Sequence, residues 1–204
     1  MCDLDAIRTV RSRGIFMEHA APEGSGAMSA VLGMDAAVIE DVLNGREGVS
    51  IANYNCPGQI VITGEAAAVA EAGTALKEAG ARRVLPLKVS GPFHSPMMRP
   101  AGEELAKVFA GVSMNPLKVP YVANINAEVI TDCGRIEGLL VEQVSGSVRW
   151  QQSVETMIRE GVDTFVEIGP GKTLTGFLRK IDKNVKAYHI GSWEEAVQVC
   201  EELK

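Results

Sequence analysis

The pattern of apolar and polar positions changes period several times over the first quarter of the chain. Near the start, apolar or small residues recur at helical spacing, at Ile7, Val10, Gly14 and Met17. This spacing predicts a helix over residues 4–20 that packs through one face. A segment rich in Gly, Pro and Ser follows at 21–26 and predicts a loop.

Residues 27–89 then alternate between short strand patterns and helical patterns. Strands are predicted at 27–32, 49–53, 59–63 and 83–89. Helices are predicted at 35–44, where Asp35 can cap the first turn, and at 65–79, which Gly80 ends. The resulting order, strand-helix-strand-strand-helix-strand, is that of a ferredoxin-like unit.

The remainder of the chain returns to alternating helices and strands. Helices are predicted at 100–109, 138–144, 154–160, 172–181 and 194–203, and strands at 119–125, 164–168 and 185–190. The run 164–168 is apolar enough to indicate a strand buried on both faces, as parallel strands are. The fold class is therefore α/β, with a parallel-sheet subdomain at 1–26 and 90–204 and the ferredoxin-like unit inserted at 27–89. About three strands are too few for an ordinary sheet of about five or six, so this subdomain is expected to be incomplete.

Composition narrows the class of protein. The net charge is −6, from 20 basic and 26 acidic residues, and the absence of a basic run argues against nucleic acid as the main partner. No apolar run reaches the ~18 residues that cross a membrane, and the opening MCDLDAIRTV lacks the apolar stretch of a signal peptide. The four cysteines show no metal-binding spacing, which predicts reduced thiols in a cytoplasmic protein.

The segment VSGPFHSPMM, at 89–98, carries the clearest candidate for chemistry. It holds His94 between Pro92 and Pro96, on a stiff loop after an apolar run, where catalytic bases are often displayed. A histidine base needs a nucleophile, yet no G-x-S-x-G elbow occurs; the nearest match, at 48–52, has Ala in place of the second Gly. From the residues alone, a loop histidine that makes only backbone contacts is an equally good interpretation.

Five motifs in register carry a resemblance to a known family. They are RSRGIFM at 11–17, GAMSAVLG at 26–33, NYNCPGQIVITG at 53–64, VSGPFHSPMM at 89–98 and VEIGPGKTLTGF at 166–177. Together they closely resemble the malonyl-CoA:acyl-carrier-protein transacylases. The resemblance implies an α/β-hydrolase-like large subdomain with the ferredoxin-like unit inserted. It also implies transfer of malonyl from coenzyme A to acyl carrier protein in fatty acid synthesis, with the coenzyme A thioester as substrate and no cofactor or metal.

The chain departs from this family at one decisive place. The family's N-terminal segment, with its G-H-S-L-G elbow, nucleophilic serine and oxyanion-hole residues, has no counterpart in the sequence. Ser90 and Ser95 flank the histidine but sit on no strand-to-helix elbow, so neither is expected to replace that serine. We therefore expect the chain to be inactive alone. The alternatives are a non-catalytic module that binds carrier protein or acyl-CoA, and half of a split enzyme completed by a separate polypeptide.

The resemblance also implies roles for individual residues. His94 matches the catalytic base, Arg13 the arginine that binds the malonyl carboxylate, and Gln143 the position whose backbone carbonyl orients the histidine. Helical spacing alone does not distinguish Arg13 from Arg11, and a solvated arginine and an exposed helical glutamine are the alternatives.

Two further residues are expected beside the acyl group. Asn55 falls in the N-x-N-x-P-G-Q signature that the family places beside the acyl pocket, although Asn, Pro and Gly also favour tight turns. Phe93 matches a position where a bulky ring favours malonyl over methylmalonyl, a discrimination of about 1–3 kcal/mol per methyl group.

Overall fold

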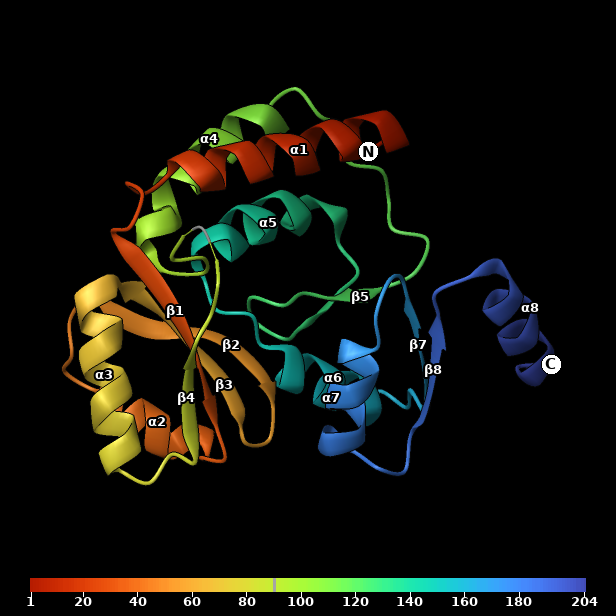
Figure 1. Ribbon diagram of the computed structural model, residues 1–204. Helices are drawn as coiled ribbons and strands as arrows, with labels where there is room; N and C mark the ends of the chain where they lie inside the picture. Colours follow the sequence, from red (N-terminus) through yellow and green to blue (C-terminus); the bar gives the residue numbers. More distant parts are fainter. Residues whose placement is uncertain (90) are drawn as a thin grey trace.

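The computed structural model describes residues 1–89 and 91–204 and is shown in Figure 1. Its first half contains α1 (Asp3–His19), β1 (Gly26–Leu32), α2 (Ala36–Leu43), β2 (Val49–Cys56), β3 (Gln59–Glu65), α3 (Ala66–Glu78) and β4 (Arg83–Pro86). Its second half contains η1 (Pro96–Met98), α4 (Arg99–Phe109), β5 (Tyr121–Val122), β6 (Val129–Ile130), η2 (Cys133–Arg135), α5 (Ile136–Ser145), α6 (Trp150–Arg159), β7 (Thr164–Ile168), α7 (Thr173–Ile181), β8 (Lys186–Ile190) and α8 (Trp193–Glu202). No helix among the described residues is both long and apolar enough to cross a membrane.

Four strands form one antiparallel sheet in the order β2-β3-β1-β4, which agrees with the predicted strand-helix-strand-strand-helix-strand unit. Alternation along β1 sends Val31 to one face and Ala30 to the other. Helices α2 and α3 cover the first face, where Ile39, Ile62 and Leu76 are fully buried. The second face packs against Phe93, so the sheet supports the loop that carries His94.

A second layer of helices lies above this sheet in Figure 1. α1 packs along α4, and α4 packs on α5. Their shared core contains Met17, Met98, Leu105 and Phe109, with Phe93 partly buried against it. Phe93 therefore contacts both cores, and the histidine loop runs between the four-stranded sheet and the helices.

The helix predicted at 4–20 is present, but its predicted packing face is only partly right. Met17, one member of the predicted stripe, is buried and packs in the core shared with α4. Ile7 is 67% exposed and Val10 is 69% exposed, whereas Thr9, outside the stripe, is buried. The helix therefore packs through a face that includes Met17 but leaves Ile7 and Val10 uncovered by any described element.

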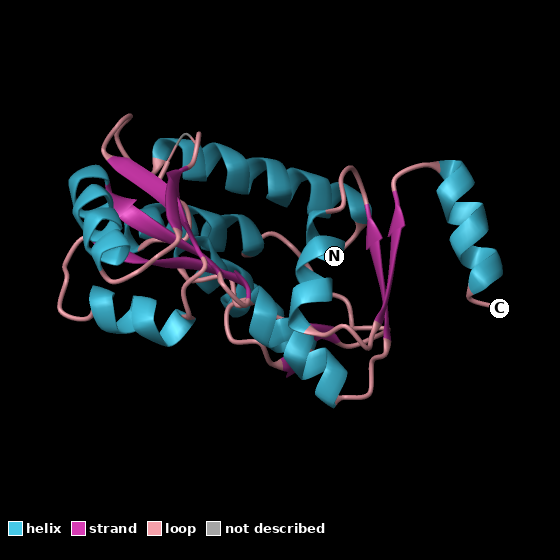
Figure 2. Ribbon diagram, turned by 60° about the horizontal axis from the view of Figure 1, so that its bottom comes forward, coloured by secondary structure: helices cyan, strands magenta, loops and turns pink. Residues whose placement is uncertain are grey.

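The predicted burial of the strand at 164–168 is also wrong. β7 pairs in parallel with β8 alone, and Ile168 is 78% exposed. Figure 2 shows these two strands standing apart from the four-stranded sheet, with the C-terminal helix α8 beyond them. The apolar run was correctly identified as a strand, but among the described residues nothing covers the face with Val166 and Ile168.

Smaller corrections concern element ends. The strand predicted at 119–125 is only the two-residue β5, because Asn124–Ala127 turns back into the unpredicted β6, with Ala127 at φ +58°. The strand predicted at 83–89 ends at Pro86. Asp35 occupies the position before α2, but its side chain makes no capping hydrogen bond.

Candidate active site

The loop that carries His94 is held from both sides. The Ser95 hydroxyl is buried, donates to the carbonyl oxygen of Pro92 at 2.7 Å and accepts from the backbone N–H of Met97 at 3.2 Å. The Pro92 ring lies against Gly26, so closely that a Cβ at residue 26 would overlap it. This packing ties the histidine loop to the first residue of β1, and the Ser95 hydroxyl makes its hydrogen bonds within that loop.

His94 has an unusual backbone conformation. Its φ is +59°, in the left-handed region that residues with a side chain seldom adopt. Such a conformation persists only where the surroundings enforce it, and it is common at functional sites. Here it turns the imidazole towards the C-terminal end of α5.

The contacts of the ring determine which nitrogen carries the proton. Nδ1 of His94 lies 3.1 Å from the backbone oxygen of Gln143 and 3.1 Å from that of Gly146. A carbonyl oxygen can only accept, so Nδ1 must be protonated and donate. Nε2 of the neutral ring is then the unprotonated nitrogen, as a general base requires.

The surroundings of His94 also keep the ring neutral. Burial lowers its pKa below the ordinary 6.5, and the nearby charge of Arg13 lowers it further. The hydrogen bonds to Gln143 and Gly146 act in the opposite direction and only partly offset burial. The imidazole therefore favours the unprotonated form at neutral pH, and no acidic group is among the causes of the shift.

His94 opens onto a cavity of about 460 Å³, within the usual range for small-molecule sites. The cavity is lined by Arg13, Gly14, Met17, Met28, Asn53, Leu87, Val89, Phe93 and His94. One cation and one imidazole thus meet in a largely apolar surround. Among the described lining residues there is no Ser, Thr or Cys to serve as a nucleophile; Ser90 lies outside the described residues.

The structure separates the two arginines that helical spacing could not. Arg13 lines the cavity and is half-buried, which lowers its pKa, whereas Arg11 is exposed. Within the described part of the chain, no carboxylate forms an ion pair with Arg13. A half-buried guanidinium without an internal partner is well suited to bind an incoming carboxylate.

Of the other predicted site residues, two lie at the cavity or in contact with His94 and one does not. Phe93 lines the cavity, and the Gln143 carbonyl contacts His94. Asn55 is in β2 but does not line the cavity; Asn53 of the same signature does. Gly146, whose carbonyl shares the histidine proton, was not predicted, because no local pattern marks it.

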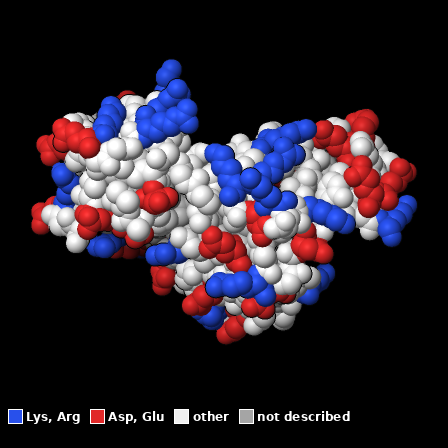
Figure 3. All heavy atoms as spheres, turned by 90° about the horizontal axis from the view of Figure 1, so that it is seen from below, with Lys and Arg blue, Asp and Glu red and all other residues white. Residues whose placement is uncertain are grey.

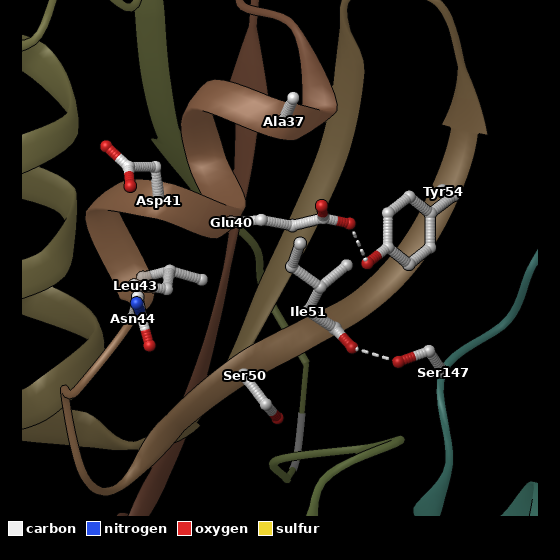
Figure 4. A pocket seen from close by; sticks show the side chains of 9 residues that line it. All are labelled: Ala37, Glu40, Asp41, Leu43, Asn44, Ser50, Ile51, Tyr54 and Ser147. Atoms are coloured by element: carbon white, nitrogen blue, oxygen red, sulfur yellow. Dashed lines mark hydrogen bonds between the residues drawn. The ribbon is translucent and has the colours of Figure 1, made fainter.

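Two other cavities have no histidine in their lining. One of about 510 Å³, shown in Figure 4, is lined by Glu40, Asp41 and Tyr54 among others. The Tyr54 hydroxyl donates to Glu40 at 2.7 Å, and burial together with that carboxylate raises the pKa of Tyr54 to about 12. Tyr54 is thus a poor proton-transfer group at neutral pH.

The other cavity, of about 400 Å³, is basic. Arg82, Arg83 and Lys180 line it together with the Pro57–Gly58 turn. Figure 3, which views the molecule from below, shows Lys and Arg side chains in several groups with Asp and Glu side chains between them. This cavity suits a phosphate group better than a reacting acyl group. In the described residues, no cluster of three or more His, Cys, Asp or Glu could hold a metal ion.

Comparison with known proteins places this geometry in context. Residues 1–199 match the family model described as acyl transferase domain. The chain is 45% identical over 204 residues to a malonyl CoA-acyl carrier protein transacylase of Bacillus subtilis (strain 168), covering 98% of this chain and 64% of that relative. The counterpart from Escherichia coli (strain K12) is 45% identical over 181 residues, covering 87% of this chain and 58% of the relative.

Solved structures agree with the sequence relatives. A transacylase of the same name from Clostridium perfringens superposes with a TM-score of 0.93 at 40% identity, covering 98% of this chain and 64% of that one. A malonyl-transacylase in complex with a type II polyketide synthase acyl-carrier protein gives a TM-score of 0.90 at 39% identity, covering 97% and 65%. The chain thus spans 58–65% of the lengths of these proteins.

Proposed function

We propose, because the chain belongs to the acyl transferase family, that its residues supply the base and the carboxylate-binding cation of a malonyl transfer site. The donor would be malonyl-CoA and the acceptor an acyl carrier protein, as in fatty acid synthesis. The observation that carries the proposal is the pairing in one cavity of Arg13, free of any described carboxylate, with His94, whose Nε2 is free to accept a proton.

The chemistry of malonyl explains why a cation and a base would share one cavity. A malonyl thioester bears a carboxylate close to the reacting carbonyl, and an arginine can bind that carboxylate through two parallel hydrogen bonds. An acetyl group would leave Arg13 half-buried and unpaired. The Phe93 ring would limit room for a branched acyl group.

His94 would act in both halves of the reaction. In the first half, a hydroxyl attacks the thioester carbonyl and gives its proton to Nε2, and the departing coenzyme A thiol takes that proton back. In the second half, Nε2 takes the proton of the phosphopantetheine thiol as it attacks the acyl ester, and returns it to the hydroxyl. Throughout, Gln143 and Gly146 hold the Nδ1–H, so the ring keeps its orientation.

The attacking hydroxyl would come from a segment outside these 204 residues, from an elbow of the G-H-S-L-G type that the family carries. No described residue that lines the cavity offers a hydroxyl or thiol. Without the nucleophile, transfer is expected to fall by about a millionfold, the size of the loss when a serine protease lost its serine.

The subdomain division and the partner surface form part of the same proposal. Residues 27–89 would be the ferredoxin-like small subdomain, and 1–26 with 90–204 would belong to an α/β-hydrolase-like large one. The basic cavity with Arg82, Arg83 and Lys180 would attract the phosphates of coenzyme A or of a carrier protein's phosphopantetheine.

Binding measured by calorimetry tests the role of Arg13 without requiring turnover. The chain is expected to bind malonyl-CoA more tightly than acetyl-CoA, because only malonyl offers a carboxylate. Arg13→Lys should reduce that preference, since lysine cannot form the paired hydrogen bonds. Arg11→Lys, a matched change at an exposed position, should leave it unchanged. Equal affinity for the two thioesters, or an unaffected Arg13→Lys variant, would refute the assignment.

A non-catalytic module that holds acyl-CoA or carrier protein is the second candidate. The lack of a nucleophile among the described lining residues favours it. The two candidates share the binding result and differ in transfer once an elbow is supplied.

A further inference from the structure

Two backbone carbonyl oxygens, those of Gln143 and Gly146, accept from Nδ1 of His94. Further hydrogen bonds hold Gly146 and the residues after it in place. Gln143 lies in the last turn of α5 and Gly146 immediately follows that helix. Helix ends leave carbonyl oxygens without helical partners, so these two oxygens are free to receive the Nδ1–H of His94 at 3.1 Å each. Gly146 is in extended conformation and depends on contacts beyond the helix to stay in place.

The first support is the side chain of Gln143. Its Nε2 donates to the backbone oxygen of Gly146 at 3.0 Å and to that of Ser147 at 3.3 Å. The reverse amide orientation would point an oxygen at two carbonyl oxygens, so the donor must be on this side. Gln143 therefore contributes twice, through its carbonyl to His94 and through its carboxamide to the carbonyl of Gly146.

The second support comes from the four-stranded sheet. The Ser147 hydroxyl donates to the backbone oxygen of Ile51 at 2.6 Å, and this bond is drawn in Figure 4. Val148 then pairs with the edge strand β2, donating to the oxygen of Ala52 at 2.7 Å and accepting from the N–H of Tyr54 at 2.9 Å. The residues after Gly146 thus form a short parallel extension of that sheet.

Space around Gly146 is tight. A Cβ at this residue would meet the end of the Ile125 side chain and lie 3.1 Å from the backbone oxygen of Glu142.

We propose that the Gln143 carboxamide and the Ser147 hydroxyl are positioning groups for His94, acting through the Gly146 carbonyl. They couple the orientation of the base to the edge strand β2 of the 27–89 unit. The inference rests on the proposed function for its catalytic meaning, but the coupling is a property of the folded chain and can be measured without turnover.

The test is a nitrogen-15 NMR titration of the histidines in the chain, with the His94 signals assigned by their loss in His94→Gln. The unaltered chain is expected to show Nδ1 protonated and Nε2 unprotonated at neutral pH. Ser147→Ala and Gln143→Met should each convert this single tautomer into a mixture. They should also lower the titration midpoint of His94, because the Gly146 hydrogen bond favours the protonated ring.

Two controls separate positioning from general damage. Ser147→Thr keeps the hydroxyl and should restore the tautomer and the midpoint. Ser145→Ala removes a neighbouring serine for which the described structure records no side-chain hydrogen bond, and should change neither. The same spectra report folding, and because the two positions are supported separately, either variant decides the question if the other does not fold.

The proposal is overturned if folded Ser147→Ala or Gln143→Met keeps the unaltered His94 nitrogen shifts and midpoint. The Gln143 carbonyl alone would then orient the ring. Failure of malonyl-CoA binding would count against the proposed function and leave this result unaffected, so the two failures are distinguishable.

Discussion

The 27–89 unit and the rest of the chain have similar element patterns but differ in how completely they are packed. In the unit, two helices close one face of the sheet and the histidine loop packs on the other, leaving Ile39, Ile62 and Leu76 with essentially no exposed surface. In the rest, apolar side chains such as Val10 and Ile168 are mostly exposed. The spacing of apolar residues thus identifies a helix or strand. Whether its apolar face is buried depends on which other element packs against it, and the spacing does not specify that element.

The largest expected difference between the regions is in core stability. Ile62→Ala removes fully buried volume from the 27–89 unit and should lower the free energy of unfolding by about 2–5 kcal/mol. Ile7→Ala, at a position 67% exposed, should change it by no more than about 0.5 kcal/mol. Urea denaturation measures both. Similar losses for the two variants would mean that α1 is covered in solution.

A smaller effect is expected where the two regions meet. Gly26→Ala places a methyl group against the Pro92 ring and should cost about 1–3 kcal/mol, as overpacking does. Gly138→Ala, in α5 with open space around it, should instead stabilise by up to about 1 kcal/mol. Thermal unfolding measures whether each substitution lowers or raises the stability. A harmless Gly26→Ala would show that the loop is not held by this contact.

The pH dependence of stability tests the electrostatics of the same junction. The pKa of His94 is lowered on folding, so between the folded pKa and the ordinary 6.5 the unfolded chain binds more protons. Stability should therefore fall as pH decreases through this window. His94→Gln should remove that part of the dependence, measured as unfolding free energy from about pH 7.5 to about pH 5. A variant with an unchanged pH profile would contradict the assignment.

The smallest change in unfolding free energy is expected for a substitution in β7, which should instead change self-association. Ile168→Lys should leave the unfolding free energy within about 0.5 kcal/mol, because the side chain is 78% exposed. It should reduce self-association, since an uncovered apolar strand edge favours it. Gln198→Lys adds the same charge on exposed α8 as a control. Equal self-association of the two variants in sedimentation would show that the chain does not associate through β7.

The sequence predicted the fold of the 27–89 unit better than that of the rest of the chain. Alternation along β1, β2 and β3 and the turn at Pro57–Gly58 predicted the sheet unit nearly in full, because each strand carries its own alternating pattern and the unit's own helices cover one face of the sheet. The brief β5–β6 hairpin was missed because a turn at Asn124–Ala127 overrides an apolar run.

The candidate site shows a similar limit. His94 was identified from its two flanking prolines and its motif, but its positive φ and its contact with Gly146 arise only when segments 52 residues apart in the chain come together. Arg13 could not be separated from Arg11 by helical spacing, because the cavity that distinguishes them is built by other elements.

One measurement tests the central claim that these residues supply base and cation but not nucleophile. Malonyl transfer to acyl carrier protein is measured for the 204-residue chain and for the same chain fused behind a family segment that carries the G-H-S-L-G elbow. The account predicts no meaningful transfer by the chain alone, and transfer by the fusion that His94→Ala abolishes. Transfer at an ordinary rate by the chain alone, or by a fusion indifferent to His94→Ala, would contradict it.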